Sequence, residues 1–199
     1  FLLYGPVLAV KLSQDFSLST VLLVGNTGGE VSADGITDDY DWNLKVRRVD
    51  SDTALNYSLG SVFKLFAGCK VMWYRVTYNT PDTSAYPTIT QGEEVVTTEL
   101  CIGPAAGVSA TVNPFGNVFL MGNVSGMYLR SKYEDDQEGN STFMLYGYNA
   151  ALSVAYYIPA ASTVIALGGR YQAAKSENEA HKNWERFYGV TLSATYSFS

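Results

Sequence analysis

The last twelve residues before the final serine carry the pattern that most constrains the fold of this chain. One set of alternate positions is apolar or aromatic: Tyr188, Val190, Leu192, Ala194, Tyr196 and Phe198. The positions between them are small or polar: Gly189, Thr191, Ser193, Thr195 and Ser197. Successive side chains of a β-strand point to opposite faces, so this alternation predicts a strand with one apolar and one small, polar face.

The same two-faced pattern recurs along the whole chain, in segments of the length that a tilted strand needs to cross a bilayer. Short turns containing Gly, Pro or Asp join the segments in pairs, and longer polar connections separate the pairs. The sequence therefore predicts one all-β domain over residues 1–199, a transmembrane antiparallel meander β-barrel. The nine predicted strands are 2–13, 16–26, 41–61, 64–78, 96–112, 117–133, 142–158, 163–175 and 186–198.

Composition favours a barrel whose apolar face meets lipid. Charged residues make up 16% of the chain, against about 25% in typical soluble domains. Aromatic residues make up 14%, including 15 tyrosines, as the interfacial girdles of a membrane barrel require. The net charge of −6 argues against a nucleic-acid partner.

Polar residues on the other face are candidates to line the barrel lumen. A Lys or Arg that faced lipid at mid-depth would cost about 2–4 kcal/mol, so charges are expected inside. Two interpretations of these residues remain open: they pair across a filled lumen, or they line a narrow polar path for solutes. The predicted lumen-lining residues are Lys11, Lys70, Glu99, Asn123, Asn149 and Arg170.

Residues 45–52 carry charges on both faces of their predicted strand. We expect such a segment to lie beyond the hydrocarbon layer, as a wet rim with exposed ion pairs that contribute little stability.

Nine strands are an unusual number, because bacterial single-chain barrels have even strand counts. We therefore expect a further strand before Phe1, which would give ten strands in the full protein with both termini periplasmic. The alternative is eight strands, with one segment misassigned.

Three segments resemble the small outer-membrane β-barrel superfamily of Gram-negative bacteria: residues 55–60 (LNYSLG), 65–70 (LFAGCK) and 194–198 (ATYSF). Phe198 resembles the final aromatic residue that serves this family as an assembly signal, although Ser199 follows it here. The resemblance covers nearly the whole chain. It implies a location in the bacterial outer membrane, in contact with membrane lipid and lipopolysaccharide, and it supplies no catalytic residue.

The sequence predicts no catalytic residue, metal site or cofactor. His181 is the only histidine, and Asn183 occupies the position where lipid A deacylase barrels carry a Ser. Cys69 and Cys101 fall on opposite faces of their predicted strands, so we expect free thiols.

The expected function is a structural or interaction role that is not enzymatic, with acidic extracellular loops and protein partners at the loops or rim. The alternatives are a narrow, porin-like path for small hydrophilic solutes and, third, a lipid-modifying enzyme. A soluble lipocalin-like barrel is the rival class, and it would need an apolar interior and a charged exterior. The acidic loop residues are Asp34, Asp38, Asp39, Asp41, Glu134, Asp135, Asp136 and Glu138.

Overall fold

The computed structural model describes residues 2–32, 41–79, 94–135, 139–177 and 182–198, and nearly all of these lie in β-strands. A single 3-10 turn, Pro159–Ala161, interrupts them, and no helix within these ranges is long and apolar enough to span a membrane. The strands are β1 (Leu2–Lys11), β2 (Phe16–Ser32), β3 (Asp41–Leu59), β4 (Phe63–Asn79), β5 (Glu94–Phe115), β6 (Val118–Asp135), β7 (Gly139–Ile158), β8 (Thr163–Glu177) and β9 (Lys182–Phe198).

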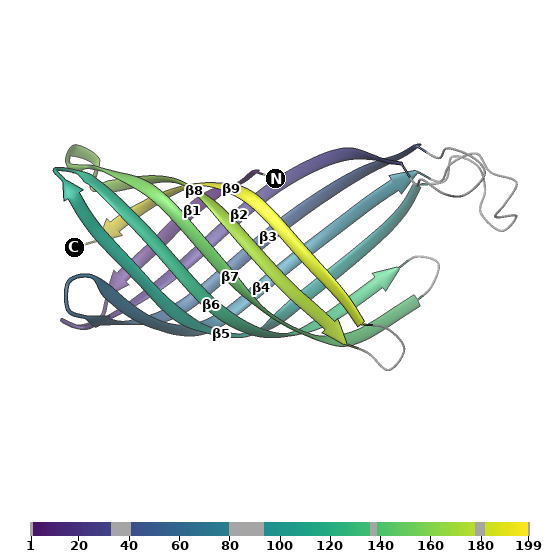
Figure 1. The fold of residues 1–199 in the computed structure, drawn as a ribbon, viewed down its shortest axis with the longest axis horizontal. Coiled ribbons are helices and arrows are strands. Elements are labelled where there is room, and N and C mark those ends of the chain that lie inside the picture. Colours follow the sequence, from purple (N-terminus) through teal and green to yellow (C-terminus); the bar gives the residue numbers. More distant parts are fainter. Residues whose placement is uncertain (1, 33–40, 80–93, 136–138, 178–181, 199) are drawn as a thin grey trace, which may run out of the picture.

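The nine strands close into a barrel in which each strand pairs antiparallel with the next in sequence (Figure 1). The barrel closes through a parallel pair, β1 with β9, in a register that runs from Leu2 opposite Val190 to Val10 opposite Phe198. An odd number of alternating strands forces one parallel pair of neighbours, and parallel ladders are slightly less stable per residue. The predicted all-β meander barrel is confirmed with nine strands in this chain.

The structure also bears on the two other strand counts. The alternative of eight strands is wrong, since every predicted segment forms a strand of the barrel. A tenth strand before Phe1 stays a prediction, because the described residues do not test it.

Four tight connections gather at one end of the barrel, which we call the turn end (Figure 1). Gly60 and Gly116 adopt φ values of 71° and 54°, in the left-handed region that glycine tolerates best. Ser162 adopts the same region after the 3-10 turn, with φ 47°. At the opposite end, here called the loop end, β2, β4, β6 and β8 end and β3, β5, β7 and β9 begin (Figure 1).

The outer face of the barrel is apolar and the inner face is mixed. Alternate residues on each strand are exposed to the outside, and they are mostly Leu, Val, Ile, Phe and Tyr. Cys69 is exposed on this outer face and Cys101 is buried on the inner one, so the prediction of two free thiols is confirmed. Outward examples are Leu8, Leu22, Leu65, Ile102, Val108, Val124, Leu152 and Leu167.

Inward-facing glycines allow neighbouring strands to approach closely. A Cβ added at Gly68 would lie 1.9 Å from the Thr53 carbonyl oxygen, and one at Gly147 would lie 2.1 Å from that of Ala173. No L-side chain fits at these distances without a shift of backbone. These glycines mark places where the backbone of a neighbouring strand comes too close for a larger residue.

Candidate functional site

The centre of the lumen holds a buried ion pair between two residues of β3. Asp50 accepts hydrogen bonds from Arg48 through both of its carboxylate oxygens, at 2.7 Å from Nε and 2.8 Å from a terminal guanidinium nitrogen. The side chains are 2% and 1% exposed. They share a face because positions two apart on a strand point the same way.

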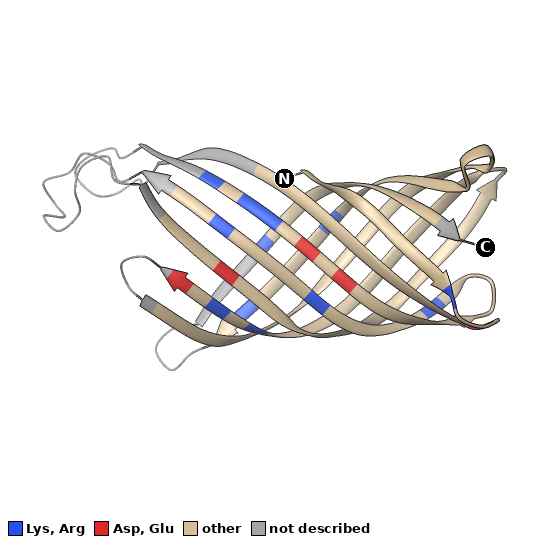
Figure 2. Cartoon of the chain, turned by 180° about the vertical axis from the view of Figure 1, so that it is seen from behind, with Lys and Arg blue, Asp and Glu red and all other residues tan. Residues whose placement is uncertain are grey.

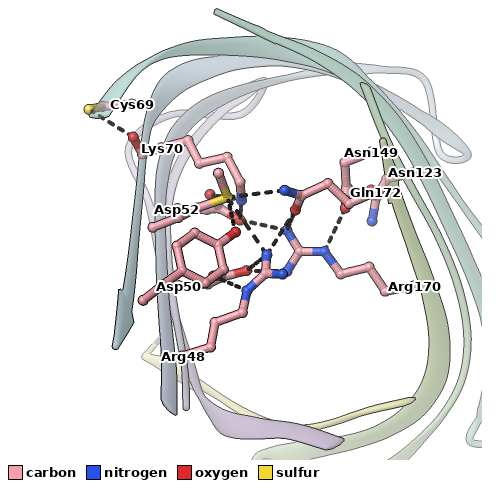
Figure 3. A network of polar contacts seen from close by, with 11 residues as sticks. Arg48, Asp50, Asp52, Cys69, Lys70, Asn123, Asn149, Arg170 and Gln172 are labelled. Atoms are coloured by element: carbon pink, nitrogen blue, oxygen red, sulfur yellow. Dashed lines mark hydrogen bonds and ion pairs between the residues drawn. The ribbon is translucent and has the colours of Figure 1, made fainter. Parts of the chain in front are cut away.

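Arg170 reaches the same carboxylate from the opposite wall of the barrel (Figure 3). Its guanidinium lies 3.0 Å from Asp50 Oδ2 and 3.8 Å from Asp52 Oδ2, and its Nε donates to Asn149 Oδ1 at 2.5 Å. Arg170 belongs to β8, which four strands separate from β3 on one side and three on the other. The contacts therefore cross the lumen from wall to wall.

A second ion pair continues this network on β4. Lys70 donates to both carboxylate oxygens of Asp52, at 2.6 and 2.9 Å. Lys70 is almost fully buried, whereas the Asp52 side chain is 34% exposed. Asn149 extends the chain of contacts to Asn123, with a nitrogen-to-oxygen distance of 3.4 Å.

Neutral side chains make the remaining contacts of the Arg48 guanidinium. Its guanidinium donates to Gln172 Oε1 at 2.9 Å and lies over the rings of Tyr74 and Phe187, with its central carbon 4.9 and 4.8 Å from the ring centroids. Gln172 in turn contacts Met72 Sδ at 3.2 Å. Three cations face two carboxylates in this network, and the electron-rich ring faces offset part of the excess positive charge.

An apolar cluster packs beside the network and fills more of the lumen. Its members come from β4 to β8, and several are completely buried. The cluster consists of Met72, Tyr74, Cys101, Met127, Leu129, Leu145 and Ala174, with Ala105, Phe143 and Phe187 packed against it. The interior is thus a packed core at this level.

Two small cavities lie inside the described part of the barrel. A gap of about 10 Å³ beside Arg48, Arg170 and Gln172 has room for one water molecule at most. A polar cavity of about 220 Å³ lies against Asp52 and Lys70, lined also by Asn56, Asn123 and other small or polar residues. A larger hollow, about 840 Å³, lies on the outer face among residues such as Val124, Leu152 and Tyr188.

The structure places the six predicted lumen residues in three settings. Lys70, Arg170, Asn149 and Asn123 belong to the network just described. The Glu99 carboxylate accepts hydrogen bonds from Ser131 at 2.6 Å and Cys101 at 3.1 Å. Lys11 is exposed at the end of β1, beside the turn, and takes no part in the network.

The expectation of a wet rim over residues 45–52 is wrong for Arg48 and Asp50. Arg48 and Asp50 are among the most deeply buried side chains of the barrel, whereas Arg47 is exposed outside. Sequence reasoning missed them although a signal was present, because positions 48, 50 and 52 continue the inward parity of Ala54 and Asn56. Gln172 was missed as well, although it shares a face with Arg170.

Some candidate residues lie outside the described part of the chain. These are His181 and five residues of the acidic loops: Asp34, Asp38, Asp39, Asp136 and Glu138. The backbones of Asp41 and Asp135 lie in strands, but their side chains also fall outside the described part. Within the described ranges, no group of three or more His, Cys, Asp or Glu residues is arranged to hold a metal ion.

A scan against models of known protein families gives no match. A search of curated proteins gives no relative either. The function of the barrel is therefore argued from its own geometry.

Proposed function

We propose that this chain is an integral β-barrel of the Gram-negative outer membrane, with a structural or interaction role that is not enzymatic. The observation that carries the proposal is the network across the lumen. Arg48, Asp50 and Arg170 have side chains only 2%, 1% and 8% exposed, and they join β3 to β8. A lumen filled in this way holds the walls together and does not form an open channel.

The distribution of polarity supports a membrane environment. Exposed Leu, Val and Tyr side chains cover the outer face, whereas a soluble barrel of the lipocalin type would need a charged exterior. Most charged residues of the described strands lie in the half of the barrel near the loop end (Figure 2). Arg48, Asp50 and Lys70 are buried inside the lumen. This is the arrangement expected if lipid surrounds the middle of the wall and solvent begins near the loops.

In this proposal the loop end faces outward from the cell and the turn end faces the periplasm. The barrel contacts outer-membrane lipid and lipopolysaccharide, and its acidic connections and rim offer surfaces for protein partners. The long connections and short turns follow the asymmetry of outer-membrane barrels.

A narrow pore is the second candidate function. The observation that favours it is the polar cavity of about 220 Å³ next to Asp52 and Lys70, which is large enough for several water molecules. A pore would require the network above this cavity to open.

Planar-bilayer conductance separates the two candidates. We expect the purified full chain to give no stable single-channel steps, and we expect the double variant Arg48→Ser, Arg170→Ser to give steps because it removes both guanidinium groups from the lumen. Lys11→Ser is the matched control, since Lys11 is a cation outside the network. Stable steps from the unaltered chain would replace the structural role with the pore.

Membrane location has its own test. Detergent-extracted membranes are run on SDS gels with and without heating, after separation of inner and outer membranes. We expect a heat-modifiable band in the outer-membrane fraction. A soluble band whose mobility does not change on heating would overturn the membrane proposal and favour a soluble ligand-binding barrel.

A further inference from the structure

Two arginines face each other directly across neighbouring strands on the outside of the barrel. Arg47 on β3 is the cross-strand partner of Arg75 on β4, and both side chains are exposed. Their neighbours Arg48 and Tyr74 point into the lumen, so the two guanidinium groups project from the opposite, outer face.

Directly opposed like charges destabilise a sheet unless something compensates them. Among the ion pairs of the described residues, none includes Arg47 or Arg75. The chain as a whole carries a net charge of −6, so an excess of cations on this surface does not follow from composition. The pair is a positively charged site with no compensating anion among the described side chains.

The position of the pair relates it to the edge of the apolar outer face. Val49 and Trp73 lie on the same face, two residues further from the loop end than Arg47 and Arg75. They are cross-strand partners of each other, and Leu100 on β5 is the partner of Trp73 on its other side. From there toward the turn end, β4 presents no outward-facing charge. The arginines therefore stand where an apolar surface gives way to a polar one.

Other outward cations lie around the wall toward the same end. Lys132 on β6 pairs with Leu100 across the strands, and Arg130 is on the same face two residues away. Arg186 on β9 is exposed outside as well. Lys132 contacts Glu134, an acid in this zone with an exposed side chain. The cations form a partial belt, and the Arg47–Arg75 pair is the point where two of them oppose each other directly.

We propose that Arg47 and Arg75 together bind the phosphate group of a membrane lipid. The inference rests on the membrane location proposed above. Guanidinium groups present several N–H donors in a fixed plane that matches phosphate oxygens, and charge-assisted hydrogen bonds of this kind are strong. One anion between the two arginines would remove the like-charge repulsion that the register creates.

The apolar neighbours of the site favour a lipid over free phosphate. Two exposed cations hold a free anion weakly, because water and salt screen the attraction. A lipid whose tails lie along Trp73, Val49 and Leu100 keeps its phosphate at high effective concentration beside the arginines. Tryptophan is also the side chain most suited to the boundary between headgroups and tails.

The test measures lipid binding to the full chain in an uncharged detergent by native mass spectrometry. The probes are phosphatidic acid, the diacylglycerol with the same tails, and inorganic phosphate. We expect phosphatidic acid to bind the unaltered protein about tenfold more tightly than it binds the variant Arg47→Gln, Arg75→Gln, from the loss of two exposed charge pairs. Diacylglycerol should not distinguish the two proteins.

The matched control is Lys11→Gln, Lys64→Gln, which removes the same charge near the turn end. Equal affinity of phosphatidic acid for the arginine variant and the unaltered chain would overturn the inference, as would an equal loss in the lysine control. Binding of inorganic phosphate as tight as that of the lipid would overturn the assignment of a lipid ligand.

Insertion into phosphatidylcholine vesicles is measured on the same preparations. Failure of the unaltered chain to insert would contradict the proposed membrane function. If the chain inserts normally but binds phosphatidic acid no more tightly than diacylglycerol, the proposed membrane function stands and only the arginine site is rejected.

Discussion

Arg48 and Asp50 lie two positions apart on β3 and form an ion pair of two hydrogen bonds, 2.7 and 2.8 Å long, in the centre of the barrel. The side chains are 2% and 1% exposed, so water could not solvate either charge if its partner were removed. Removing charges from water is costly, and the pair is tolerable only because Arg170 and Gln172 supply further polar contacts. The network is therefore a set of mutually dependent groups that fixes how β3 and β8 face each other.

Replacement of Arg48 by Met should destabilise the barrel strongly. The substitution leaves the Asp50 carboxylate buried with Arg170 as its remaining cation. Loss of one partner of a buried pair costs about 3–5 kcal/mol of unfolding free energy. Urea unfolding in detergent micelles measures the change, with Lys11→Met as the control at an exposed position. A change as small as that of the control would show that the pair does not stabilise the fold.

Replacement of Lys70 by Met should cost less than replacement of Arg48. Its partner Asp52 has a side chain 34% exposed, so water can solvate the carboxylate that remains. We expect a loss of about 1–3 kcal/mol in the same unfolding measurement. The variant Asp52→Asn, combined with Lys70→Met in a double-mutant cycle, gives the coupling between the two residues. A loss larger than that of Arg48→Met would contradict this order.

Addition of a methyl group at Gly147 should destabilise the wall, whereas the same change at Gly169 should be tolerated. A Cβ at Gly147 meets the Ala173 carbonyl oxygen at 2.1 Å, and one at Gly169 meets no heavy atom within 4 Å. Overpacking against rigid backbone costs about 1–3 kcal/mol. The difference in stability is measured as the temperature at which the folded band on SDS gels converts to the unfolded band. Equal conversion temperatures for Gly147→Ala and Gly169→Ala would argue against tight strand approach at Gly147.

The two cysteines should differ in reactivity while the barrel is folded. Cys69 is exposed on the outer face and Cys101 is fully buried beside Glu99 in the lumen. A membrane-permeant thiol reagent should modify one cysteine per folded chain, and peptide mapping should place the label on Cys69. After unfolding, both should react. Labelling of Cys101 in the folded barrel would mean that the lumen opens at that level.

The sequence alone predicted which residues share a face, and most predicted strand boundaries lie within three residues of those observed. The exceptions are β2, which continues six residues beyond the predicted end to Ser32, and β9, which begins four residues early at Lys182. The reason is that side chains alternate with a period of two residues, so each strand reports its own two faces locally. Lys70 and Arg170 were assigned to the lumen on this basis. The exposed Lys11 shows its limit, because parity does not say how near a residue lies to the end of the barrel.

The tertiary structure decided which inward side chains meet. Arg48 and Gln172 are 124 residues apart, and their contact depends on how many strands close the barrel and on the parallel register of β1 with β9. Strand number and stagger set the diameter of the lumen and the level at which opposite walls face each other. No local pattern contains that information. The sequence by itself determined an apolar outer face and an inner face that carries charges. Only closure of the nine strands turned separate charges on β3, β4 and β8 into one buried network beside an apolar cluster.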